Sequence, residues 1–312
     1  MLASIVIRTY NEARHLDELL RRIAAQKLNG LNTETLVIDS GSTDVTVEIA
    51  KAYACRVFHI GRDEFTFGRS LNRGCENAAG DYLIFISGHC LPENEHWLSG
   101  LISPLQKQIV VYSYGRQLGN GSSRFSECQL FKKYFPEVSR IPQEGFFCNN
   151  ANAALLREVW VRYRFCDDLT GLEDMDLGKR LTNDGLKIAY VAPAAVYHLH
   201  DETWSQIRNR YEREALALQK IMPEVSVSIT DFVRYFLSGV FLDFSASLQE
   251  KRFLETAHQI VLYRFMQFWG AYQGNHLHRK LSKERKERYF YPRKAIARPI
   301  AYRGTLEKSR DS

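Results

Sequence analysis

Short apolar runs alternate with segments in which apolar residues recur every three or four positions. The runs fall at 4–8, 35–38, 56–60 and 81–86, and small or polar residues follow each of them. Such runs are typical of buried parallel strands, and the segments between them of helices. The first of these helices presents one apolar stripe, formed by Leu16, Leu19, Leu20 and Ile23. The pattern predicts an α/β fold with a mostly parallel central sheet flanked by helices.

Beyond residue 86 the pattern is looser. It predicts a strand at 109–114, a turn running into a helix over 146–157, a helix at 173–183, and short strands at 187–191 and 195–199.

The last third is helical in pattern, over 204–220, 229–244 and 250–272. We therefore divide the chain into a nucleotide-binding and catalytic domain (1–203), an aromatic-rich helical region (204–278) and a basic tail (279–312).

The composition is that of a globular protein, with 312 residues of which 45% are hydrophobic. The six cysteines are scattered without a C-x-x-C pair, which favours a reducing compartment over a disulfide framework or zinc ribbon. No apolar run reaches the ~18 residues of a membrane span, and the richest stretch, 232–242, contains Arg234. Without a signal-peptide pattern, we expect a cytoplasmic protein, either free or peripheral on the inner face of the membrane.

The net charge of +6 is unevenly distributed, because residues 279–303 hold ten Lys and Arg against two Glu. Tyr289, Phe290 and Tyr291 interrupt this basic stretch. One interpretation is a contact with an anionic membrane surface. A solvated tail or an oligomer contact is the alternative. No nucleic-acid partner is expected, since no known binding module accompanies the charge.

Carboxylates follow the first two predicted strands, in T-Y-N-E at 9–12 and D-S-G-S-T-D at 39–44. Loops at the carboxyl ends of parallel strands line the ligand crevice of open α/β sheets. There is no glycine-rich phosphate loop, so this crevice suits the base and ribose of a nucleotide. Its diphosphate is left to a metal or to basic side chains.

Four motifs in this order resemble family 2 glycosyltransferases of the GT-A type. They are T-Y-N-E at 9–12, I-D-S-G-S-T-D-V-T at 38–46, N-R-G-C-E-N-A-A-G-D-Y-L-I-F-I at 72–86 and G-L-E-D-M-D-L at 171–177. The resemblance covers about residues 1–200. It implies a GT-A fold with a helical C-terminal extension, and an inverting transferase that uses a nucleoside-diphosphate sugar.

The resemblance also implies a donor site. It places Asp39 on the edge of a uracil, thymine or guanine base, among donor-binding residues that include Thr9, Asn11, Glu12, Ser42, Asp44 and Ser87. Taken alone, Asp39 and Asp44 favour a turn Asx residue and a charge at a helix N-terminus, and it is the flanking motifs that favour a donor site.

The expected catalytic residues are Asp174, as the base that takes the proton of the acceptor hydroxyl, and its neighbour Glu173. The alternative is that these carboxylates and Asp176 only oppose a helix dipole.

The metal element departs from the family pattern. Where the family has an acidic D-x-D-like turn, this chain has Ser87-Gly88-His89, with His89 in the last position. His198 and His200 share one face of a short predicted strand, so all three histidines are metal candidates. Imidazole ligands shift preference from Mg²⁺ toward Mn²⁺ or a later metal. The alternative is a metal-independent site in which Arg69 and Arg73 neutralise the leaving group.

The acceptor and sugar subsites are assigned to Asn149, Asn150 and Trp97. The asparagine amides can bind sugar hydroxyls or cap a turn. Trp97 can stack on a sugar or pack in the core.

The function we expect is sugar transfer to an oligosaccharide or lipid-linked acceptor in surface polysaccharide biosynthesis, such as lipopolysaccharide or capsule. Similarity to rhamnosyltransferases favours a deoxyhexose donor such as dTDP-rhamnose. The alternatives are a catalytically silent scaffold that binds nucleotide sugars, and a nucleotidyltransferase, which would need a triphosphate loop not found here. The sequence leaves the oligomeric state open.

Overall fold

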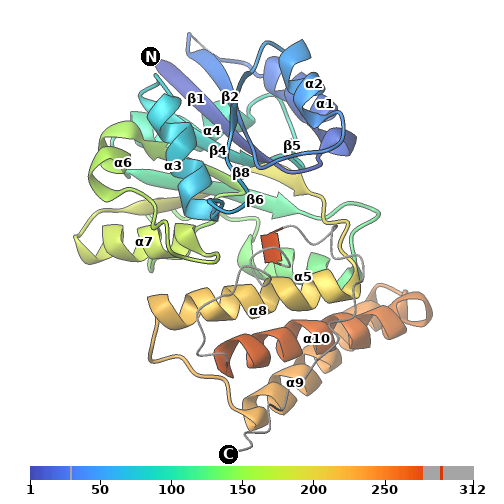
Figure 1. Cartoon of the computed structure of the whole chain (residues 1–312). Coiled ribbons are helices and arrows are strands. Elements are labelled where there is room, and N and C mark those ends of the chain that lie inside the picture. Colours follow the sequence, from blue (N-terminus) through green and yellow to red (C-terminus); the bar gives the residue numbers. More distant parts are fainter. Residues whose placement is uncertain (29, 277–288, 291–312) are drawn as a thin grey trace, which may run out of the picture.

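The computed structural model describes residues 1–28, 30–276 and 289–290 (Figure 1). A sheet with helices on both faces forms one part, and three long C-terminal helices pack beside it. The predicted basic tail lies outside the described residues, apart from Tyr289 and Phe290.

The described strands are β1 (Leu2–Thr9), β2 (Asn32–Asp39), β3 (Arg56–His59), β4 (Tyr82–Ser87), β5 (Cys90–Pro92), β6 (Tyr112–Leu118), β7 (Asn152–Leu156) and β8 (Ile188–His198). The described helices are α1 (Ala13–Ala24), α2 (Thr46–Ala52), α3 (Phe67–Asn77), α4 (Trp97–Gln106), α5 (Phe125–Tyr134), α6 (Arg157–Tyr163), α7 (Glu173–Asn183), α8 (Trp204–Ile221), α9 (Ile229–Gln249) and α10 (Phe253–His276).

The strands form one sheet in the order β3-β2-β1-β4-β7-β6-β8-β5. The first four are mutually parallel, whereas β7 runs antiparallel to both of its neighbours. In this register Thr9 lies beside Asp39, and Arg8 beside Ser87. The parallel half therefore brings the polar ends of three strands to a single edge of the sheet, as the pattern predicted.

Two sequence predictions about secondary structure are wrong. The apolar segment that we expected to begin a helix at Ala153 is strand β7, which is inserted between β4 and β6 and is almost wholly buried. A short apolar run does not distinguish such a strand from a buried helix. The two short strands predicted on either side of Pro193 are one strand, β8, because a bulge opposite Gly115 and Gln117 accommodates the exposed proline.

Two apolar cores cover the faces of the sheet. One contains the buried stripe of α1 together with Trp97 and Leu101 of α4. The other packs α3, α6 and α7 against the opposite face, with Phe85 and Tyr190 among its members. The stripe that the spacing predicted on α1 is thus the buried face of that helix.

The helical layer begins at α8, where Thr203 caps the helix in a reciprocal capping box with Gln206. Buried Arg264 of α10 donates two hydrogen bonds of 2.7 Å to Asp243 of α9. The pair fixes the angle between these two helices and turns Asp243 toward the inside of the layer. Among the described helices, none combines the length and apolar character that a membrane span requires.

Candidate active site

Asp39 lies at the end of β2 with its side chain 1% exposed. Its carboxylate accepts hydrogen bonds from the Thr9 hydroxyl at 3.2 Å, from the Ser42 hydroxyl at 2.5 Å, and from the backbone N–H groups of Gly41 and Ser42 at 3.0 Å. Gly41 has a φ of 91°, a conformation that favours glycine. The carboxylate therefore holds the 39–42 turn, as the turn interpretation predicted. A nucleobase would reach it only if the freely rotating Ser42 hydroxyl turned away.

Hydrogen bonds join the turn after β1, at residues 11–13, to the turn after β2, at residues 42–44. Asn11, at a φ of 54°, donates its N–H to the Ser42 hydroxyl and accepts the Thr43 N–H at 2.7 Å. The Asp44 carboxylate accepts the Ala13 N–H at 3.3 Å. The structure thus brings the predicted donor residues of both turns together around one site.

Arg69 and Arg73 do not lie with the histidines. They line a cavity of about 140 Å³ at the outer ends of β3 and α3, together with His59 and Asn72. The His59 Nδ1 atom is 3.6 Å from Asp39. This cavity is therefore adjacent to the Asp39 turn.

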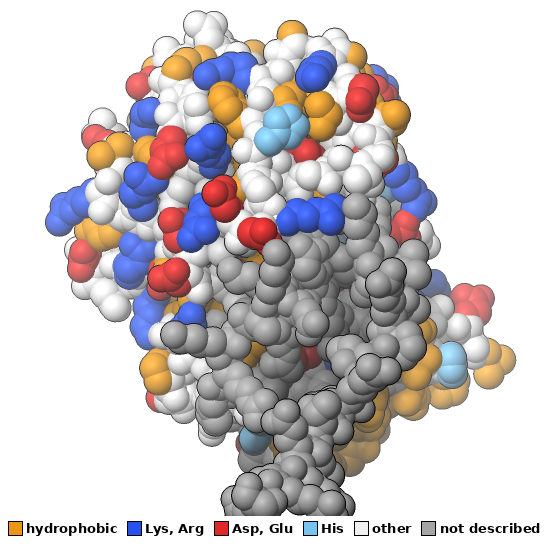
Figure 2. Space-filling view, in the orientation of Figure 1, with side chains coloured by type: hydrophobic (Ala, Val, Ile, Leu, Met, Phe, Trp, Pro, Cys, Tyr) orange, Lys and Arg blue, Asp and Glu red, His pale blue; other side chains and the backbone are white. Residues whose placement is uncertain are grey.

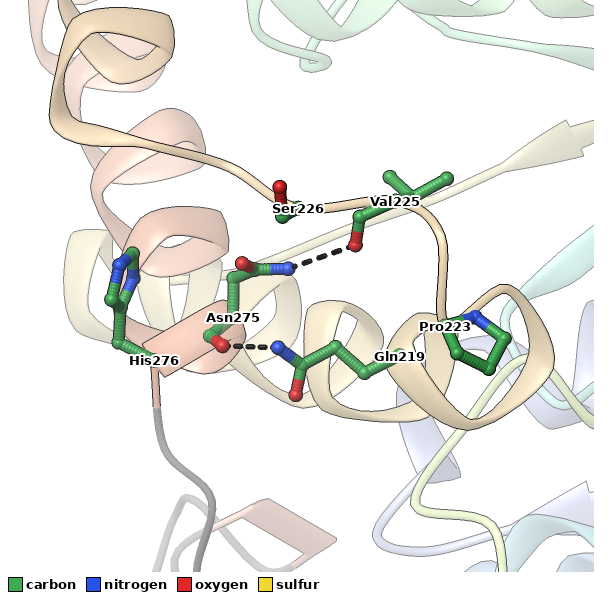
Figure 3. A pocket seen from close by; sticks show the side chains of 6 residues that line it. All are labelled: Gln219, Pro223, Val225, Ser226, Asn275 and His276. Carbon is green, nitrogen blue, oxygen red and sulfur yellow. Dashed lines mark hydrogen bonds between the residues drawn. The ribbon is translucent and has the colours of Figure 1, made fainter.

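A larger cavity, of about 470 Å³, opens in the helical layer between the loop after α8 and the end of α10 (Figure 3). Asn275 bonds across it to Gln219 and Val225. Among the described residues that line this cavity, His276 is the one titratable side chain. The cavity therefore lacks the acidic groups that a group-transfer site would use.

Glu173 and Asp174 begin α7, directly after Leu172, which has a left-handed φ of 56°. Asp174 is 7% exposed and accepts hydrogen bonds from the backbone N–H groups of Asn150 at 2.9 Å and Met175 at 2.8 Å. Asn150 is thereby part of the support of the carboxylate. Its own Oδ1 accepts from the Tyr112 hydroxyl at 2.5 Å.

Arg8 pairs with one of the two carboxylates. Its guanidinium lies 3.2 Å from Glu173 and over the Phe67 ring, at 4.9 Å from the ring centroid. Among the described residues, Asp174 has no cation in ion-pair contact. Burial, and then the charge of Glu173, raise the pKa of Asp174 to about 7, against the two N–H donors that stabilise its ionised form. A carboxyl with such a pKa can take up a proton near neutral pH.

His89, His198 and His200 converge where β4 and β8 end and β5 begins. The Nε2 atoms of His89 and His198 are 3.1 Å apart, and the rings of His198 and His200 lie 4.0 Å apart, centroid to centroid. The three residues offer ligand atoms that all lie within 4.8 Å of one another. Gly88 makes this possible, because a Cβ there would be 2.9 Å from the Glu12 side chain.

Each histidine has its Nδ1 atom held by an acceptor. His89 pairs with Glu12 at 2.9 Å, His198 with the Gln117 Oε1 at 2.6 Å, and His200 with Glu127 at 2.6 Å. Nδ1 is therefore the donor in all three rings. Nε2 carries the lone pair in any neutral ring, as metal-ligating histidines require.

The His198 tautomer is fixed by a relay that ends in the backbone. The Ala151 N–H donates to the Asn149 Oδ1 at 3.0 Å, so this oxygen can only accept from the Gln117 amide, at 2.8 Å. The Gln117 oxygen must then face His198, which must donate. Asn149 therefore contributes to orienting a histidine of the cluster.

The electrostatics of the cluster suit a cation. Burial, followed by the neighbouring His200 and His89, keeps the pKa of His198 well below its ordinary value, so this ring is neutral. Burial opposes the charged form of His89, but Glu12 outweighs it and raises the pKa of that ring. Glu127 and Glu202 flank His200. Three imidazoles among carboxylates form a donor set that fits a divalent transition metal.

Residues 4–163, about half of the chain, match the family model described as glycosyl transferase family 2. The chain belongs to glycosyltransferase family 2. The transferase is 29% identical over 200 residues to the O-antigen chain rhamnosyltransferase WbaN of Salmonella anatum, a match that covers 60% of this chain and 63% of that protein. It is 25% identical over 224 residues to the O-antigen chain rhamnosyltransferase RfbN of Salmonella typhimurium, covering 68% and 70%. The match thus spans less than two thirds of the length of WbaN.

Solved structures show the same fold. The mannosyltransferase PcManGT from Pyrobaculum calidifontis, in complex with GDP-Man and Mn²⁺, has a TM-score of 0.57 at 16% identity, covering 93% of this chain and 87% of that chain. Glucosyl-3-phosphoglycerate synthase from Mycobacterium tuberculosis, with Mn²⁺ and UDP, has a TM-score of 0.51 at 21% identity, covering 70% and 79%. The predicted GT-A fold of the transferase is confirmed.

Trp97 was wrongly assigned to a sugar subsite. The ring is 0% exposed and its Nε1 donates to the Asn152 Oδ1 at 2.8 Å, so the indole is a core residue. Asn150, 1% exposed, likewise cannot face an acceptor in this conformation. The Asn149 side chain accepts the Ala151 N–H, as a turn residue does, and the Asn150 side chain instead accepts the Tyr112 hydroxyl.

Arg8, Gln117 and Glu127 are site residues that the sequence motifs did not predict. Arg8 carried a signal, since a charged residue at the end of a buried strand has to meet a partner. Gln117 and Glu127 carried none, because the elements that hold them meet the histidines only in the folded chain.

Proposed function

We propose that this glycosyltransferase is an inverting enzyme that moves a sugar from a nucleoside-diphosphate donor to a glycan or lipid-linked acceptor in surface polysaccharide biosynthesis. The observation that carries the proposal is the buried Asp174 carboxyl at the start of α7, held by two backbone N–H groups beside the ion-paired Glu173, where burial raises its pKa to about 7. The printed names of WbaN and RfbN support a rhamnosyl donor, for which dTDP-rhamnose is our candidate.

Asp174 acts as the general base in this proposal. Its carboxylate takes the proton of the acceptor hydroxyl while that oxygen attacks the anomeric carbon and the nucleoside diphosphate leaves from the opposite face. The Arg8 ion pair leaves Glu173 less suited to this step, so Glu173 positions Arg8 and keeps the pKa of Asp174 high. The Arg8 guanidinium in turn lies over the Phe67 ring.

Asp39 and its turn form the base subsite. We assign the nucleobase N–H to the Asp39 oxygen that the Ser42 hydroxyl occupies in the free protein. Asn11 and Asp44 hold the turn around the ribose side. Arg69 and Arg73 border the adjacent cavity, so we place them at the base side of the site instead of at the leaving diphosphate.

His89, His198 and His200 would hold a divalent cation, and such an ion, when bound, neutralises charge that develops on a leaving diphosphate. Their fixed Nδ1 donors support this assignment. The imidazole set favours Mn²⁺ or a later metal over Mg²⁺. The presence of Mn²⁺ in the PcManGT and glucosyl-3-phosphoglycerate synthase complexes is compatible with it.

The test is Asp174→Asn, assayed for release of nucleoside diphosphate from dTDP-rhamnose and from UDP-, GDP- and other dTDP-sugars. We expect a loss of ~10²–10⁴-fold in turnover with little change in nucleotide affinity, because a base acts in the transition state. Asp176→Asn, two positions further along α7, is the matched control, and we expect it to keep most of the activity. Equal turnover in Asp174→Asn and wild type would exclude Asp174 as the base and favour a scaffold role.

A further inference from the structure

Helix α9 has an outer face that carries large apolar side chains and little charge. Within residues 232–249 the charged side chains are Arg234 and Asp243, and Asp243 is buried against Arg264. Arg234 is therefore the single charged side chain of this stretch that faces outward. The internal ion pair makes the outer surface more apolar than the sequence suggests.

The exposed apolar residues of α9 form a continuous stripe. They recur at helical spacing, with Leu237 58% and Phe241 73% exposed, and the stripe consists of Val233, Leu237, Phe241 and Leu248. Such a stripe ordinarily faces a core. Here it is a surface, and we call it the α9 face.

The α9 face continues onto the start of α10. Leu254 is 95% exposed in the first turn of that helix, just after the connection from α9, and Val261 and Phe265 extend the apolar surface along α10. Figure 2 shows apolar side chains gathered over this end of the helical layer, to the lower right of the view. Soluble monomers rarely leave a patch of this kind without a partner.

Cations and carboxylates both border the α9 face, and among the described residues Lys251 is the cation of the α9–α10 connection with no carboxylate in ion-pair contact. Lys251 and Arg252 are exposed in the α9–α10 connection, beside Leu254. Of the acidic residues at this end, Glu250 lies 2.9 Å from Lys132 and Glu255 lies 3.7 Å from Arg252. The sequence that follows the end of α10 at His276 is also basic, with ten Lys and Arg against two Glu in residues 279–303.

We propose that the α9 face, extended by Leu254, Val261 and Phe265, docks on the surface of an anionic lipid bilayer. A helix lying in the interface inserts its apolar side below the headgroups and keeps cations at their level, which is the arrangement found here. Charge complementarity favours anionic lipid over a second copy of this chain, because the same cations would face each other across a symmetric interface. The proposal rests on this surface alone and is independent of the assigned transfer chemistry.

The experiment is sedimentation of the full chain with vesicles of phosphatidylglycerol and phosphatidylethanolamine, and with pure phosphatidylcholine. We expect binding to the anionic vesicles that weakens in high salt. Leu237→Glu combined with Phe241→Glu should lower the bound fraction at least about tenfold, since it removes two inserted side chains and adds two repelled charges. Val161→Glu, at a residue 63% exposed on α6, is the matched control and should bind as wild type.

Leu254→Glu provides a second variant in case the double substitution disturbs folding, because a side chain 95% exposed supports little packing. Unchanged vesicle binding in both variants would overturn the proposal. The proposal would also be overturned if the wild type failed to bind anionic vesicles and light scattering showed a dimer instead. In that case Leu254→Glu or the double variant would convert the dimer to a monomer. That result would assign the α9 face to a second copy.

Discussion

The guanidinium of Arg8 lies 3.2 Å from the carboxylate of Glu173, 165 positions away in the chain. It joins the last residues of β1 to the first turn of α7 and so connects the two halves of the candidate site. Thr9, the next residue, contacts Asp39 on the other side. A single strand end therefore links the donor turn to the catalytic carboxylates.

Replacing Arg8 should shift the pH dependence of the reaction. Arg8→Gln leaves Glu173 without its partner and removes a cation that lowers the pKa of Asp174. We expect the acidic limb of kcat/KM against pH to move upward by about one unit and the protein to lose about 1–3 kcal/mol of stability. Arg8→Lys keeps the positive charge, so its acidic limb should lie close to that of the wild type. An unshifted limb in Arg8→Gln would show that Arg8 does not act on the base.

Asp174 should make the wild type less stable as pH rises. Its pKa is raised from 3.8 to about 7 in the folded protein, so the folded state binds the proton more tightly than the unfolded chain does. This contribution to stability is complete below about pH 4 and is lost as pH rises through about 7. Relative to wild type, Asp174→Asn should therefore gain about 2 kcal/mol between about pH 5 and about pH 8. Urea unfolding at both pH values measures the gain, and a difference independent of pH contradicts the raised pKa.

Asp39 and Ser42 should respond oppositely to substitution. Asp39→Asn keeps one oxygen for the Gly41 and Ser42 N–H groups but places an NH2 group where the nucleobase N–H is assigned, and we expect the affinity for dTDP or UDP to fall about 10–100-fold. Ser42→Ala frees one Asp39 oxygen and should leave that affinity equal or higher. The exposed Asp168→Asn is the control, and calorimetry is the measurement. If Ser42→Ala weakens binding as much as Asp39→Asn, the carboxylate only holds its turn.

Gln117 should control the affinity of the histidine cluster for a metal. Gln117→Leu removes the acceptor that fixes the His198 tautomer, and we expect Mn²⁺ affinity to fall about 10–100-fold. Gln117→Glu still accepts from Nδ1 and should retain most of the affinity. Competition with a chelating dye measures both variants. Equal Mn²⁺ affinity in Gln117→Leu and wild type would show that the relay through Gln117 does not support metal binding.

Much of the fold follows from local patterns. The apolar runs at β1, β2 and β4 and the stripe on α1 are long enough to identify the parallel half of the sheet, and α7 has the bounds that its pattern predicts. The pattern failed at β7, where the segment is short and buried on both sides, so strand and helix look alike in sequence.

The site was only partly predictable for a similar reason. Asp39 and Asp174 were predictable because each belongs to a short motif at the end of a strand or the start of a helix. Trp97 and Gln117 depend on packing between distant segments, which decides that one is buried against Asn152 and the other faces His198. The direction of Asp243, which leaves the α9 face apolar, is likewise set by a tertiary partner.

The most direct test of the account is calorimetric titration of the protein with dTDP, UDP, GDP and CMP, each with Mn²⁺ and again with EDTA. We expect selective binding of one nucleoside diphosphate in Mn²⁺, with loss of binding in EDTA and in His198→Ala, and retention in Asp174→Asn. Binding that is the same in EDTA would contradict the metal assignment of the three histidines. An absence of binding to all four nucleotides would contradict the donor site itself.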